Sequence, residues 1–126
     1  MPYLYPPFIV RDSTVRGGDL IRGFHAYSII GDEIEVDTPY ETDLVSYTFA
    51  FGIRMTGWRV IGDVHADLFF YINDELWDVG LIDGEPGIHD KRFPGRDMVS
   101  GDTIKIAVQK RKDSTSHYFR GEVYLW

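Results

Sequence analysis

The C-terminal stretch, residues 101–126, constrains the fold more than any other part of the chain. Apolar residues alternate there with polar residues or glycine in two runs, at Ile104, Ile106 and Val108 and again at Phe119, Val123 and Leu125. A period of two is typical of a strand with one buried and one solvated face. The segment between the runs, residues 110–116, is polar and turn-forming. We therefore predict an antiparallel strand pair with Phe119, Val123 and Leu125 facing a core.

Strand-like stretches recur along the rest of the chain, at residues 8–10, 24–30, 34–36, 44–53, 58–61, 66–72 and 76–82. Turn-forming residues separate them, including Gly57 and the pair Asn73-Asp74. Apolar residues at the three- and four-residue spacing of a helix are nearly absent. Short strands between regular turns predict an all-β fold, an antiparallel β-sandwich of the jelly-roll kind.

The chain has 126 residues, which is the length of one domain. We expect residues 1–23 to form an extended N-terminal arm, because Pro2, Pro6 and Pro7 favour an irregular path. The arm would either follow the protein's own surface or dock on a neighbouring subunit. Residues 24–126 would form the sandwich.

Charge and composition exclude several classes of partner. The net charge is −7, which argues against nucleic acid, since phosphate contacts need a basic face. Without cysteine there is neither a disulfide nor a thiolate metal site. No apolar run has the length of a membrane span, and the first residues lack the pattern of a signal peptide. We therefore expect a protein made in a cytoplasm, without membrane insertion.

Residues 83–101 interrupt the rhythm of strands, because two prolines and four glycines fall within them. We predict a long loop with at most one short strand near Ile88, and long loops in compact domains are often functional. The residues expected to contact a partner are Glu85, His89, Lys91, Arg92, Phe93 and Arg96. Its cations, and the predicted hairpin tip at residues 110–112, are expected in solvent, where they can steer the protein towards an acidic surface.

Catalytic and metal-binding signals are weak. Asp83, Glu85, His89 and Asp90 cluster in the sequence, but their spacing matches no calcium loop and favours a solvated acidic segment. Patterns of serine hydrolases, dinucleotide sites and phosphate loops are absent. We expect no metal, no cofactor and no enzymatic activity.

Aromatic residues point to a surface role. Both faces of residues 66–72 are apolar, with Phe69 and Tyr71 on one of them, and the outer face of the last strand carries Tyr118, Tyr124 and Trp126. We predict that these five form one contiguous apolar patch that closes a homotrimer. Trp58, Trp77 and Trp126 could instead be platforms on which sugars stack, although core or interface packing is the favoured interpretation.

Two resemblances accompany these patterns. Residues 101–106 and 119–125, a Gly-Asp-led strand and a final Phe-x-Gly-x-Val-containing strand, resemble the last two strands of the trimeric jelly rolls of the tumour necrosis factor and complement-head type. Residues 56–63, 68–73 and 99–102 resemble small phage virion proteins such as capsid decoration or fibre-head modules. Both imply homotrimers, and the second implies a virion-surface protein that binds a capsid or other virion protein or a cell-surface glycan. The alternative function is a carbohydrate-binding module or lectin.

Overall fold

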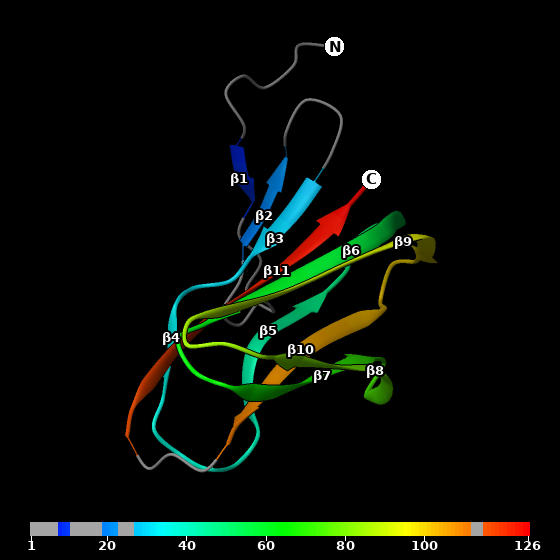
Figure 1. Cartoon of the computed structure of the whole chain (residues 1–126). Coiled ribbons are helices and arrows are strands. Elements are labelled where there is room, and N and C mark those ends of the chain that lie inside the picture. The colour runs from blue at the N-terminus through cyan, green and yellow to red at the C-terminus, as the bar shows by residue number, and fades with distance from the viewer. Residues whose placement is uncertain (1–7, 11–18, 23–26, 112–114) are drawn as a thin grey trace.

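The computed structural model describes residues 8–10, 19–22, 27–111 and 115–126, and for residues 8–10, 19–22 and 27 the backbone alone. All regular structure in these residues is β-strand, arranged in two antiparallel sheets that pack face to face (Figure 1). The predicted β-sandwich is therefore confirmed. In the described part of the chain, no helix is long and apolar enough to cross a membrane.

The larger sheet has the order β1-β2-β3-β11-β6-β9, and β4 also pairs with β11. Its strands are β1 (Phe8–Val10), β2 (Asp19–Arg22), β3 (Tyr27–Ile30), β4 (Ile34–Val36), β6 (Ile53–Gly62), β9 (Gly87–Met98) and β11 (His117–Leu125). The smaller sheet has the order β5-β10-β7-β8. Its strands are β5 (Thr42–Thr48), β7 (Ala66–Ile72), β8 (Glu75–Ile82) and β10 (Thr103–Lys110).

The strand order is that of a jelly roll. Within the larger sheet β3, β11, β6 and β9 are neighbours, and β5, β10, β7 and β8 make up the smaller one. From β4 onward, successive strands thus cross between sheets, except at the β7–β8 hairpin, as two interlocked Greek keys require. The arrangement makes β8 and β9 the edge strands on one side of the sandwich.

The predicted antiparallel pairing of the two C-terminal strands is wrong, because β10 and β11 lie in different sheets and pair with other strands. The core face that the alternation assigns to the last strand is confirmed. Phe119, Val123 and Leu125 are at most 2% exposed and face the core. Phe119 packs so closely on Gly62 that a Cβ there would lie 2.4 Å from the ring. The predicted turn at Asn73-Asp74 is also confirmed, because both residues have positive φ, as the mirror-image turn of a tight β-hairpin requires.

Two predicted boundaries are wrong. Gly57 lies inside β6 and not in a turn, because β9 approaches so closely that a Cβ would lie 2.4 Å from the Lys91 carbonyl oxygen. Residues 44–53 are not one strand, since the chain changes sheets between β5 and β6, and Phe51 is exposed.

Residues 83–101 do not form the predicted loop, because most of them build β9, a strand of 12 residues paired with β6. The register shifts beside Phe93, Pro94 and Gly95, and Gly95 has a φ of +126°. A bulge on an edge strand tolerates a proline and a glycine that a central strand would not.

The described part of the predicted arm also joins the larger sheet, and residues 8–10, predicted to be strand-like, form β1 at its edge. The rest of residues 1–26 lies outside the described residues, so docking of the arm on a neighbour stays a prediction.

Candidate functional site: a groove between β8 and β9

The inner faces of β8 and β9 meet at one side of the sandwich, where each is the edge of its own sheet. Gly80 of β8 lies against the His89 ring, and a Cβ on Gly80 would come within 2.7 Å of the imidazole. One step along, the Lys91 ammonium forms an ion pair with the Asp78 carboxylate. These contacts join the two edges at one end, and the space between the strands opens beyond them.

Aromatic rings line the open part. Trp77 and Phe93 contact each other edge to face, with centroids 5.4 Å apart. Both also contact Trp58, at 5.2 Å and 5.3 Å, and Trp58 stacks on Phe70 at 4.0 Å. Trp58 is 2% exposed, whereas Trp77 is 40% exposed. Trp77 is thus held by a rigid core cluster while part of its surface faces solvent.

Two hollows adjoin at Trp77 and Arg96, which line both of them. The larger has a volume of about 410 Å³ and is lined by Trp77, Lys91, Phe93, Pro94, Gly95 and Arg96. The smaller has a volume of about 250 Å³ and is lined by Ile72, Asn73, Glu75, Leu76, Trp77 and Arg96. We call the two together the edge groove. Its combination of an exposed indole with nearby cationic and carboxylate groups suits a small polar ligand that has one apolar face.

The polar side chains of the edge groove differ in how many hydrogen bonds and ion pairs they already form within the protein. Asn73 is held in place, because its side chain donates to Asp102 at 3.1 Å and accepts from the Thr103 N–H at 2.9 Å. Lys91 is engaged by Asp78. Arg96 places its guanidinium 5.4 Å from the Trp77 ring centroid. Glu75, at the start of β8, supplies a carboxylate to the smaller hollow.

The structure brings together three of the six residues predicted to contact a partner, since Lys91, Phe93 and Arg96 line the edge groove. His89 lies between the sheets, and burial of the ring lowers its pKa. Arg92 points to the opposite face of the larger sheet, 3.5 Å over the Tyr124 ring. Glu85 lies in the turn before β9, 3.8 Å from His65.

Sequence reasoning missed Asn73 and Glu75 as groove residues and favoured packing for Trp77. Asn73-Asp74 was predicted to be a turn. That this turn lies near residues of β9 follows only from the sheet topology, in which β9 pairs with β6. The irregularity in the β7–β8 register beside Trp77 likewise carries no clear sequence signal.

The five predicted interface aromatics do not form one patch. Phe69 and Tyr71 lie on the outer face of the smaller sheet, and Tyr118, Tyr124 and Trp126 on the outer face of the larger one. The prediction is wrong because β7 and β11 belong to different sheets, whose outer faces look in opposite directions. Phe69 and Tyr71 instead pair across strands with Val79 and Leu76.

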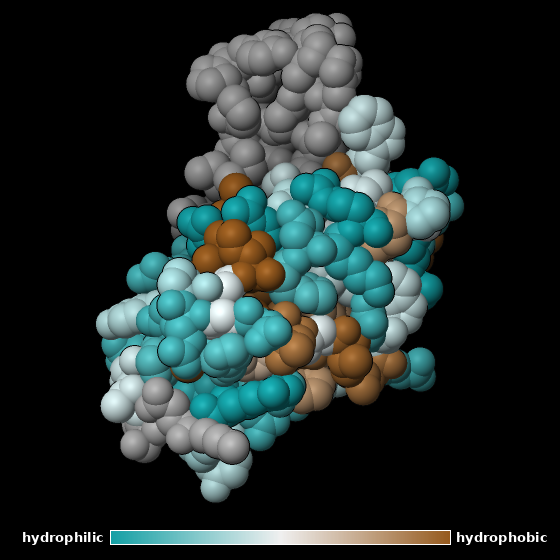
Figure 2. All heavy atoms as spheres, viewed as in Figure 1, coloured by the Kyte–Doolittle hydropathy of each residue, from teal (hydrophilic) through white to brown (hydrophobic). Residues whose placement is uncertain are grey.

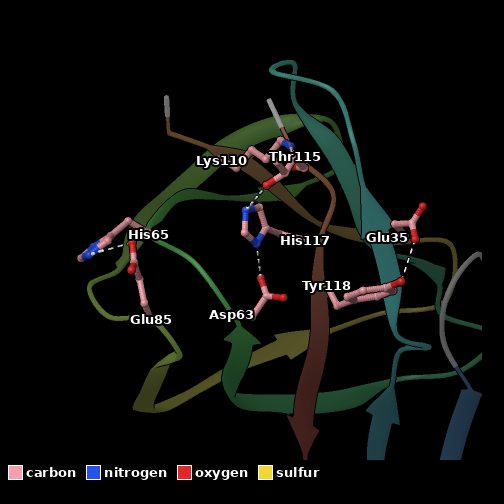
Figure 3. Close-up of polar contacts among 8 residues, drawn as sticks. All are labelled: Glu35, Asp63, His65, Glu85, Lys110, Thr115, His117 and Tyr118. Atoms are coloured by element: carbon pink, nitrogen blue, oxygen red, sulfur yellow. Dashed lines mark hydrogen bonds and ion pairs between the residues drawn. The ribbon is translucent and has the colours of Figure 1, made fainter. Parts of the chain in front are cut away.

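A second polar cluster lies at the end of the sandwich (Figure 3). The His117 ring contacts Asp63 at 2.9 Å through Nδ1 and Thr115 at 3.0 Å through Nε2. Hydroxyl, imidazole and carboxylate occur in this order in nucleophilic catalysis. However, the nearby hollow of about 420 Å³ is lined by Asp63 and Tyr118 but not by Thr115 or His117, so the hydroxyl does not face it.

The acidic sequence cluster is divided in space. Asp83 and Glu85 lie 3.3 Å and 3.8 Å from His65, whereas His89 packs between the sheets against Gly80. Within the described ranges, no group of three or more histidine or carboxylate side chains is arranged to hold a metal ion.

The predicted basic tip is only partly exposed. Lys110 ends β10 on its core-facing row, is 3% exposed, and donates to the Thr115 carbonyl. Its expected place in solvent is therefore wrong. Arg111 is exposed and pairs with Asp67 at 2.7 Å, and residue 112 lies outside the described residues.

Comparison with known proteins adds no relative: no family model matches this chain, and no curated protein matches it.

Proposed function

We propose that this protein is a non-enzymatic carbohydrate-binding module and that the edge groove is its binding site. The observation that carries the proposal is the 40% exposure of Trp77 in an open groove beside Asn73, Glu75 and Arg96. The C–H face of a pyranose ring is apolar and stacks on an indole, while its hydroxyls need polar partners around the ring. Jelly rolls include lectins and viral capsid proteins, so fold alone supports either class equally.

Two tryptophans provide a matched test. Trp77→Ala removes the proposed platform, and Trp126→Ala removes a tryptophan that is 64% exposed at the end of the other sheet. Binding is measured by titrating mono- and disaccharides from several sugar classes and following tryptophan fluorescence, with calorimetry for any sugar that gives a signal. We expect Trp77→Ala to weaken binding at least about tenfold, the loss of a central aromatic contact, and Trp126→Ala to leave it unchanged. Equal binding by wild type and Trp77→Ala would contradict the proposal.

A second proposed function is oligomeric assembly, and it is favoured by the outer face of the smaller sheet. Leu76, Val79 and Leu81 are 55%, 57% and 39% exposed, and they lie opposite Tyr71, Phe69 and Asp67. Figure 2 shows apolar atoms gathered over the part of the molecule where β7, β8 and β10 lie in Figure 1. An apolar group of this kind at a sheet edge is typical of a contact surface.

The homotrimer is tested by light scattering coupled to size exclusion. If the outer face of the smaller sheet closes it, Val79→Asp reduces the mass to that of the 14.5 kDa chain, whereas Ile88→Asp, at an exposed apolar residue of the larger sheet, does not. A wild-type mass of one chain at micromolar concentration would exclude the trimer. The virion surface as location, and a capsid or other virion protein as partner, stay predictions that rest on resemblance alone.

A further inference from the structure

Among the residues of the edge groove, Arg96 restricts the chemical class of the ligand most. Its position on β9 lies opposite Met55 of β6, on the row that faces between the sheets, yet Arg96 is exposed because β9 is an edge strand. Its side chain lines both hollows, and its guanidinium lies 5.4 Å from the Trp77 ring centroid.

Other exposed arginines of the described chain pair with carboxylates. The pairs are Arg54 with Asp97 at 3.0 Å, Arg92 with Asp90 at 3.3 Å, Arg111 with Asp67 at 2.7 Å and Arg120 with Glu122 at 3.3 Å. Within the described residues, no carboxylate lies within ion-pair distance of Arg96. Its charge lowers the pKa of Asp102, but hydrogen bonds from Val99 and Asn73 lower that pKa more. The guanidinium of Arg96 therefore has donors free to meet a ligand.

We propose that the edge groove binds an acidic sugar, with the ligand carboxylate on Arg96 and the sugar ring on Trp77. This inference rests on the carbohydrate-binding function proposed above. A planar guanidinium fork donates two parallel hydrogen bonds to a carboxylate, which a neutral sugar cannot accept with the same strength. The Trp77 ring, fixed against Trp58 and Phe93, receives the apolar face of the pyranose beside that carboxylate.

The two hollows differ in charge, and this difference determines which end of the bound ligand lies in which hollow. The larger contains Lys91 with Arg96, whereas the smaller contains Glu75 with Arg96. A carboxylate placed in the smaller hollow would meet the like charge of Glu75, which disfavours it. The acidic end of the sugar therefore lies in the larger hollow, and its hydroxyls donate to Glu75.

Glucuronic acid and glucose, as their methyl glycosides, test this proposal because they differ only in a carboxylate against a CH₂OH group at C6. Titration is followed through the indole N–H signals in two-dimensional NMR at low salt. We expect wild type to bind the glucuronide at least about tenfold more tightly than the glucoside, the gain typical of a hydrogen bond to a charged group. Arg96→Gln removes that preference, Arg96→Lys restores part of it, and Arg120→Gln behaves as wild type.

The outcomes separate the two proposals. Equal affinities for the two glycosides in wild type overturn the acidic-sugar inference and leave the carbohydrate-binding function intact. If neither these glycosides nor the wider sugar series binds, both are overturned. If sodium acetate displaces the glucuronide at equal concentration, the carboxylate alone is recognised and the sugar part of the inference is wrong. An unchanged preference in Arg96→Gln would remove Arg96 from the site.

Discussion

Strand β6 has two antiparallel neighbours, β11 and β9. Both form backbone hydrogen bonds with β6, but the side chains on their inward rows differ in chemistry. The inward row of β11 carries Phe119, Val123 and Leu125, all buried in the core. The inward row of β9 carries His89, Lys91 and Arg96, which meet β8 or the edge groove. A central strand is covered on its inner face by the opposite sheet, whereas an edge strand is covered only in part. The comparison teaches that in this sandwich the centre of the larger sheet supplies buried apolar side chains, whereas its edge supplies the polar side chains of the edge groove.

The largest effect should come from matched truncations on the two strands. Phe119→Ala removes a fully buried ring and should lower the free energy of unfolding by about 3–5 kcal/mol. Phe93→Ala removes a partly buried ring and should lower it by only about 1–2 kcal/mol. Urea unfolding measures both.

Equal losses at the two positions would show that β9 is a core strand and would break the comparison. If Phe119→Ala does not fold, the smaller truncation Val123→Ala, at a fully buried neighbour, is compared with Phe93→Ala instead.

The contact that closes the groove at one end should have the next largest effect. Gly80→Ala would place a Cβ 2.7 Å from the His89 ring, so the ring or a strand must move. We expect a loss of roughly 1–2 kcal/mol, because overpacking outweighs the gain from replacing glycine. His89→Ala makes room, so Gly80→Ala should cost little in that background. The double-mutant cycle, measured by thermal unfolding, gives a coupling near zero if β8 and β9 do not meet there.

Titration of His89 should have a smaller effect, at acidic pH. Burial lowers the pKa of its imidazole, helped by Lys91 and opposed by Asp78, Asp90 and a hydrogen bond with the Leu81 backbone. The Nε2 atom is buried and has no hydrogen-bond partner within the described residues. The unfolded chain therefore binds more protons, and stability falls as the pH drops below about 6.5.

His89→Gln, which does not titrate, should reduce this loss between pH 7.5 and pH 5. Unfolding free energies of both proteins at several pH values measure the difference. Parallel pH profiles would show that the ring is as solvated in the folded as in the unfolded chain.

Much of the fold could be predicted from the sequence, because most strands of this sandwich have one wet and one dry face. Residues 66–72 match β7, and the C-terminal alternation places Phe119, Val123 and Leu125 in the core. Strand β9 escaped prediction because its inward residues are largely polar and its bulge contains Pro94 and Gly95. Alternation of apolar and polar residues indicates that one face of a strand is buried. An edge strand such as β9 buries too few side chains for this pattern to appear in its sequence.

The site was predicted only in part for the same reason. Lys91, Phe93 and Arg96 were selected as a functional segment, but Trp77, Asn73 and Glu75 join them through sheet topology. Patterns within one segment do not show which two edges of a jelly roll meet. The prediction of a single aromatic patch was wrong for the same reason. A period of two shows which residues of a strand share a face, but it does not show in which sheet the strand lies.

The smallest effect should come from the outer row of β11, which tests whether that strand also supports recognition. Tyr118 is 45% exposed and donates to the Glu35 carboxylate of β4 at 2.7 Å.

This hydrogen bond raises the pKa of Tyr118, with the charge of Glu35 acting in the same direction. The folded chain thus keeps the phenol proton longer than the unfolded chain. The contribution is complete below about pH 10, the ordinary tyrosine value, and is lost as the pH rises through the folded pKa. Because the pair is exposed, Tyr118→Phe should change stability little at neutral pH and leave the mass in solution unchanged. Chemical unfolding and light scattering measure the two quantities, and a difference absorbance titration assigns the phenol. A large loss of stability, or a smaller assembly in the variant, would instead place Tyr118 in an interface and give β11 a binding role on its outer face.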